Sequence, residues 1–164
     1  MHPDQPASPI ASEGHFFPVD GKDANYKVNF HHGVNGADGA TDIFAPEGTP
    51  VRSVFSGEVV NAGWNELGGW SVSIKQDDGL VAYYAHLENQ PMVQAGQRVD
   101  AGQQIGVVGD TGNAAGTGAH LHFGLGKDIQ NGSGAEGGAG TDFNAVAFLQ
   151  DILKNGERPD TATA

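Results

Sequence analysis

The chain has 164 residues, which is enough for one domain with its own core. A formal net charge of −12 excludes binding to nucleic acid by general electrostatics, and the absence of cysteine excludes disulfides, thiolate zinc sites and a cysteine nucleophile. No apolar run approaches the roughly 20 residues that cross a membrane. With 26 glycines and only 38% hydrophobic residues, the composition favours short strands joined by many turns.

The N-terminal third begins with low-complexity sequence. Residues 1–14 are rich in proline, serine and alanine and predict a disordered lead-in, followed by a short strand or arm at 16–19. A loop rich in glycine, alanine and aspartate is expected from His31 to Thr41. Since no charged and then apolar leader stands at Met1, the chain is expected to be cytoplasmic, already processed or trimmed.

Between residues 42 and 125, short apolar runs alternate with turn residues. The runs that predict strands are 42–44, 51–55, 58–60, 70–74, 80–87, 107–108 and 120–125. Asp77-Asp78-Gly79 predicts a hairpin turn, and glycine-rich loops are expected at 61–69 and 109–118.

The C-terminal part changes character. Residues 131–140 predict a flexible linker, and residues 142–153 space their apolar side chains as a helix does. We therefore expect a mainly β fold, a compact antiparallel β-sandwich or open barrel with a catalytic cleft and one C-terminal helix. The expected single domain covers 15–153 with its core at 30–125, and a polar tail follows at 154–164.

The most informative motif is His120-Leu121-His122-Phe123. On a strand, side chains at i and i+2 share a face, so His120 and His122 present two imidazoles side by side. A neutral imidazole is a common metal ligand and a general acid or base near neutral pH. Two solvent-facing histidines are the alternative for an isolated pair, so other ligands must decide.

Asp42 is the acidic residue that best completes such a site. It follows a glycine-rich loop and opens an apolar strand, where a carboxylate is costly unless it is paired or ligated. The alternative is a turn carboxylate that accepts backbone N–H bonds. A catalytic zinc ion needs three protein ligands and one open position, and His122 or His120 supplies one of the three.

A series of motifs runs in order through residues 30–125. It comprises 42–51 (DIFAPEGTPV), Gly57-Glu58-Val59-Val60, Ala62-Gly63-Trp64, Gly68-Gly69, Tyr84-Ala85-His86-Leu87, the run 96–106, Gly112 and the His120–Phe123 motif. Together these motifs resemble the lysostaphin/LytM-type zinc endopeptidases, which cleave peptide cross-links of bacterial peptidoglycan. The resemblance implies a zinc metalloendopeptidase that takes a stem peptide or cross-bridge as substrate. It also implies a monomer that is secreted or held in the cell envelope, with its leader removed, or that is derived from a phage.

The resemblance also implies a role for individual residues. Asp42 and His122 are the implied metal ligands, and His120 and His86 are the implied catalytic histidines that do not bind metal. With zinc polarising the scissile carbonyl and lowering the pKa of its water, His120 is expected to act as the base on that water. His86 is expected to donate a hydrogen bond to the oxyanion and to protonate the leaving amine.

The first metal motif departs from the family pattern His-x-Gly-x-Asp, because Asp38 stands four residues before Asp42. We predict that His32 is the third ligand, across an insertion of small residues. His31 is the alternative, because His31-His32-Gly33 also matches His-x-Gly, and Asp38 is a weaker third choice.

Aromatic residues beside these motifs are candidates for substrate contacts. Tyr84 precedes His86 by two residues and is expected to share its strand face and help line the cleft, with a core tyrosine as the alternative. Trp64 and Trp70 flank a glycine loop and form either a cleft wall or part of the packing.

Two other functions compete with the endopeptidase. A catalytically inactive LytM-like module that activates or scaffolds other wall hydrolases requires a broken site. A carrier-type β-barrel requires either an exposed lysine at a hairpin tip, which no lysine here matches, or a phosphocarrier histidine, which leaves Asp42 without a role. The complete set of candidate residues therefore favours the enzyme.

Overall fold

The computed structural model describes residues 11–12, 14–20, 25–32, 37–66, 68–112, 116, 118–126, 148–149 and 151–152. Its strands, in chain order, are β1 (Ala11–Ser12), β2 (His15–Phe16), β3 (Asn25–His32), β4 (Ala37–Phe44), β5 (Pro50–Arg52), β6 (Gly57–Asn65), β7 (Gly69–Lys75), β8 (Val81–Leu87), β9 (Arg98–Val99), β10 (Gln104–Val107) and β11 (His120–Gly126). Within these ranges, no helix has the length and apolar character needed to cross a membrane.

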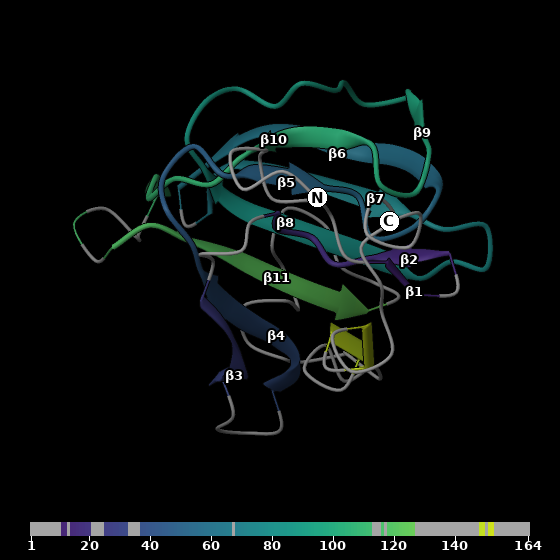
Figure 1. The fold of residues 1–164 in the computed structure, drawn as a ribbon. Coiled ribbons are helices and arrows are strands. Elements are labelled where there is room, and N and C mark those ends of the chain that lie inside the picture. Colours follow the sequence, from purple (N-terminus) through teal and green to yellow (C-terminus); the bar gives the residue numbers. More distant parts are fainter. Residues whose placement is uncertain are drawn as a thin grey trace, which may run out of the picture.

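An antiparallel sheet of seven strands forms the main layer, in the order β3-β4-β11-β8-β7-β6-β9. The strand β11 therefore lies between β4 and β8, although about 80 residues of chain separate β4 from β11 (Figure 1). A second antiparallel pair, β5 and β10, lies beside this sheet, and β1 pairs with β2. The sheets are not closed into a barrel, which confirms the predicted open, mainly antiparallel fold.

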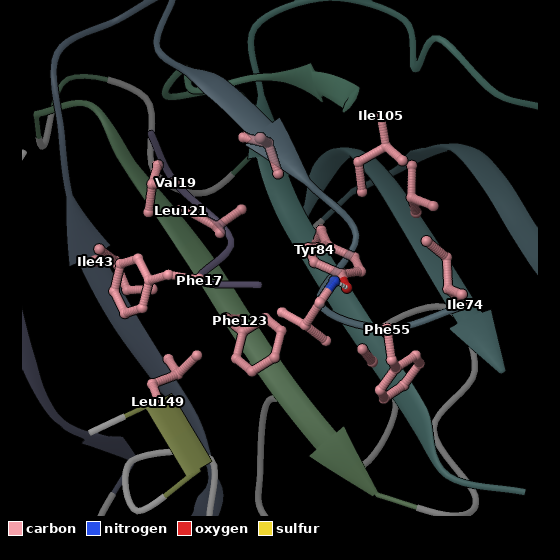
Figure 2. Packing of buried hydrophobic residues seen from close by; sticks show 14 of the residues in the cluster. Phe17, Val19, Ile43, Phe55, Ile74, Tyr84, Ile105, Leu121, Phe123 and Leu149 are labelled. Atoms are coloured by element: carbon pink, nitrogen blue, oxygen red, sulfur yellow. Dashed lines mark hydrogen bonds between the residues drawn. The ribbon is translucent and has the colours of Figure 1, made fainter. Parts of the chain in front are cut away.

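The core lies on one face of the main sheet. The alternation of β11 turns Leu121, Phe123 and Leu125 into it, while the histidines of that strand face the other way. Side chains from β5, β10 and the C-terminal helical residues join the same cluster, namely Val51, Ile105, Leu149 and Ile152. Figure 2 shows Ile105 and Leu149 among them. Burying each such side chain contributes about 1.5–3 kcal/mol before the entropy of ordering is subtracted.

Two segments that were predicted as loops form strands. Within the expected loop from His31 to Thr41, the described residues 31–32 belong to β3 and 37–41 belong to β4, and β6 continues through the first half of the expected loop at 61–69. The physical reason is pairing, since β4 bonds to β11 and the end of β6 bonds to β7. Those ladders outweigh the turn preference of glycine, alanine and aspartate.

The predicted ends of the domain are only partly within the described residues. The lead-in at 1–14 contains β1, so this part of it is paired rather than disordered. The arm at 16–19 is present as the end of β2 and a bridge from Val19 to Val51. Residues 148–149 and 151–152 are helical, as expected. The linker at 131–140, the rest of the helix and the tail lie outside the described residues.

Candidate active site

The pairing of β4 with β11 brings Asp42 and His122 together. They are direct cross-strand partners, so their side chains leave the sheet on the same face. The Nδ1 atom of His122 lies 3.2 Å from Oδ1 of Asp42, and Nε2 of His120 lies 3.6 Å from Oδ2 of the same carboxylate. All three side chains are largely buried. One carboxylate therefore faces both histidines of the motif.

His86 enters the same group from β8 through an unusual backbone. Its ring centroid lies 5.0 Å from that of His120 and 5.9 Å from that of His122. Its φ of 65° makes it the only non-glycine residue with positive φ among the described residues. A backbone of this kind costs about 1–3 kcal/mol and persists where the surroundings enforce it. The strain turns the His86 ring toward the two motif histidines.

The hydrogen bonds of His86 and His120 fix their neutral tautomers. Nδ1 of His86 lies 2.7 Å from the carbonyl oxygen of Thr111, and Nδ1 of His120 lies 2.9 Å from that of Gly118. Because a carbonyl only accepts, each Nδ1 carries the proton and donates it. Each neutral ring therefore keeps a lone pair at Nε2, and that of His120 faces Asp42. A lone pair at this atom is what a general base requires.

The same geometry changes the role expected of His86. Burial, and secondarily the proximity of His122, lowers the pKa of His86 to about 4, so the ring is neutral near pH 7. With Nδ1–H committed to Thr111, the neutral ring accepts at Nε2 and has no second proton to donate. Donation to an oxyanion therefore requires His86 to take up a proton first.

Asp42 and His122 fit a tetrahedral metal site. Zinc binds imidazole nitrogen and carboxylate oxygen at about 2.0–2.2 Å, which places neighbouring ligand atoms of a tetrahedron about 3.3 Å apart. The observed 3.2 Å between Nδ1 and Oδ1 matches this spacing. The donors are one nitrogen and one oxygen, a set suited to zinc.

The register of β3 does not bring the predicted third ligand to this pair. Asp42 is paired with Asn29, whereas His32 is paired with Ala37 at the outer end of the hairpin. Ala37 and Asp42 are five residues apart on β4, which is about 16 Å at the usual rise of a strand. Since Asn29 is the β3 residue opposite Asp42, neither His31 nor Asp38 is its cross-strand partner in this hairpin. The backbone register thus sets Asp42 beside His122 and places the backbone of His32 away from this pair.

Tyr84 lies in the core rather than beside the site. It is fully buried, it packs against Phe123, and its hydroxyl accepts a hydrogen bond of 2.9 Å from the Val54 N–H (Figure 2). The prediction that it lines a cleft is therefore wrong. Its neighbour Tyr83 is on the site face, with its ring 6.1 Å from His122. The expectation that Tyr84 and His86 share a strand face fails because the positive φ of His86 interrupts the alternation of β8.

Other aromatic side chains lie near the site or on the surface. The ring of Phe44 contacts that of His120 at 4.8 Å and remains 41% exposed. Trp64 is 54% exposed and meets Trp70 edge-on, while Trp70 packs against the core. Packing thus accounts for Trp70, and Phe44 is the exposed aromatic next to a site histidine.

Sequence reasoning missed Thr111 and Gly118 as partners of the site. Both act through a main-chain carbonyl, and a carbonyl is present at every residue, so no side-chain pattern reveals it. The available signal is indirect: both residues lie in the glycine-rich loop that precedes the His120 motif.

One carboxylate and three imidazoles thus lie together beside an antiparallel sheet, a set of donors suited to a metal-dependent hydrolase. The model of peptidase family M23 matches residues 36–134, and the chain belongs to this family. The matched range includes Asp42, His86, His120 and His122, and it begins after His32.

Individual relatives agree with this assignment. The chain is 43% identical over 94 residues to an L-Ala–D-Glu endopeptidase of Bacillus subtilis (strain 168), covering 54% of this chain and 29% of that protein. It is 36% identical over 103 residues to the peptidoglycan DD-endopeptidase ShyC of Vibrio cholerae, covering 61% and 23%. The chain thus spans less than a third of the length of these relatives. The solved catalytic domain of lysostaphin from Staphylococcus simulans superposes with a TM-score of 0.60 at 33% identity, covering 77% of this chain and 93% of that domain.

Proposed function

We propose that this domain is a zinc-dependent endopeptidase that hydrolyses peptide bonds in the stem peptides or cross-bridges of peptidoglycan. The observation that carries the proposal is Asp42 and His122 at metal-ligand spacing, with the rings of His120 and His86 beside them. A relative that is a peptidoglycan DD-endopeptidase supports the substrate class. This substrate places the action of the domain in the cell envelope or outside the cell.

The chemistry follows from the protonation of the side chains. A bound zinc ion, held by Asp42 and His122, would polarise the scissile carbonyl and lower the pKa of water. His120 accepts the proton of the attacking water at Nε2, since its Nδ1 already donates to Gly118. The leaving amine needs one proton, which the imidazolium so formed supplies.

His86 acts after His120 as a second carrier of the proton. Its Nε2 is an acceptor in the neutral ring, and its ring lies 5.0 Å from that of His120. His86 relays the same proton, because its Nε2 accepts the proton from the His120 imidazolium and then donates it to the leaving amine. Its lowered pKa favours rapid return of that proton.

Digestion of purified peptidoglycan tests the proposal. Sacculi with direct cross-links and sacculi with glycine bridges are incubated with the zinc-loaded protein, and the soluble products are identified by mass spectrometry. We expect peptide-bond cleavage of one type, abolished by EDTA and restored by zinc. Cleavage of glycosidic bonds contradicts the proposal, and so does an absence of products from zinc-loaded protein, which instead fits a non-catalytic module.

We also propose that the third ligand comes from the segment 31–38, with His32 first, on the basis of its sequence spacing. Ligation by His32 requires the β3–β4 hairpin to change its pairing, because the present register holds it opposite Ala37. We expect His32→Ala to weaken zinc binding more than about 100-fold, since a ligand contributes more than the outer-shell partners whose loss costs about 10–100-fold.

Matched variants of His31 and Asp38 decide this point. Zinc affinity is measured by competition with a chelator for His31→Ala, His32→Ala and Asp38→Ala. The expectation is a large loss for His32→Ala alone. Retained affinity in His32→Ala with a loss in one of the other two variants assigns the ligand to that residue instead.

A further inference from the structure

The residue that connects His86 to the rest of the site is Thr111, which lies in the loop before β11. Its carbonyl oxygen accepts the Nδ1–H of His86 at 2.7 Å. Its hydroxyl donates to the carbonyl oxygen of Leu87 at 2.6 Å and accepts the N–H of Trp70 at 3.2 Å. One residue thus bonds to the ring of His86, to the main chain that follows His86, and to the main chain at the start of β7.

These bonds act where the backbone is strained. His86 has a φ of 65°, and its own N–H donates to the carbonyl oxygen of Gly68 at 2.6 Å. Two hydrogen bonds thus hold the strained main chain in place: the N–H of His86 is bound by Gly68, and the carbonyl of the next residue, Leu87, is bound by Thr111. Release of either bond lets β8 return to regular alternation, which would turn the ring of His86 away from His120.

The approach of Thr111 to β7 is close enough to exclude a larger residue. A Cβ atom at Gly69 would collide with the Thr111 hydroxyl and with the main chain after it. Gly69 also has a φ of 66°. The contact between β7 and the loop is therefore built around this threonine.

We propose that Thr111 is the positioning residue for His86: its hydroxyl locks the loop so that its carbonyl fixes the ring and the Nδ1–H tautomer. This inference rests on the proposed function, because it assigns His86 its orientation for proton transfer. A valine has nearly the shape of threonine without the hydroxyl, and a serine keeps the hydroxyl, so the two substitutions separate hydrogen bonding from packing.

The first readout is independent of turnover. Long-range ¹H–¹⁵N spectra of the zinc-loaded protein report which nitrogen of each histidine carries the proton. We expect His86 to show a protonated Nδ1 in the unmodified protein and in Thr111→Ser, and a mixture of tautomers in Thr111→Val. Because no substrate is present, this result tests the proposal even if the protein cleaves no peptidoglycan.

The second readout is steady-state kinetics with a soluble peptide substrate. We expect Thr111→Val to lower kcat about 10- to 100-fold with little change in KM and with one zinc retained, part of the roughly 10²–10⁴-fold that a positioned acid or base supplies. Thr111→Ser should restore most of the activity. Thr111→Ala, which leaves more room, replaces the valine variant if that variant does not fold.

Two outcomes overturn the proposal. The first is an unchanged His86 tautomer and an unchanged kcat in both Thr111→Val and Thr111→Ala. The second is a loss in Thr111→Ser with none in Thr111→Val, since that pattern places the contribution in packing of the methyl group.

Discussion

Asp42→Ala and His122→Ala will each yield a folded protein that fails to retain zinc and has no turnover above background. The two side chains are direct cross-strand partners with Nδ1 and Oδ1 3.2 Å apart, so loss of either leaves too few donors for a catalytic zinc ion. Bound metal is measured by elemental analysis after gel filtration, and turnover is measured by release of peptides from peptidoglycan.

Two residues that do not belong to the site group provide matched controls for these variants. Asp77 is an exposed carboxylate that pairs with Arg98 on the surface, and His15 lies on β2 against Phe148. Asp77→Ala and His15→Ala should keep one zinc per chain and unmodified activity. One zinc per chain in folded Asp42→Ala or His122→Ala would sink the ligand assignment.

His120→Ala will keep zinc and lose turnover by about 1,000-fold, within the range that general acid–base catalysis supplies. Its Nδ1–H is donated to Gly118, which leaves the Nε2 lone pair facing Asp42 and able to accept a proton from water. The separation of the two effects distinguishes a proton acceptor from a ligand. The measurements are kcat at saturating peptide and the zinc content of the same sample.

The pattern across variants makes this second prediction specific. His122→Ala should lose zinc and turnover together, whereas His120→Ala should lose turnover alone. If His120→Ala loses zinc as completely as His122→Ala, then His120 is a ligand and the roles assigned here are wrong. A kcat within about tenfold of the unmodified protein would exclude His120 as the base.

Much of the site was predictable because it follows from local periodicity and motif order. The alternation of β11 places His120 and His122 on one face and Leu121 and Phe123 on the other, and this can be read from the residues alone. The motif series then indicated Asp42 and His86 as members of the site, and the structure brings both to the two histidines. The open antiparallel fold followed from short alternating runs between turn residues.

The sequence by itself thus determined the fold class and the two faces of β11, because these depend on neighbours within a few residues. Only the tertiary structure decided the rest. The register of β4 against β11 sets Asp42 opposite His122. The positive φ of His86 interrupts the alternation of β8, so that Tyr83 rather than Tyr84 lies beside the site. The main-chain carbonyl of Thr111 fixes the Nδ1–H tautomer of His86. Each of these depends on backbone atoms brought together from distant parts of the chain, and backbone atoms are the same at almost every residue.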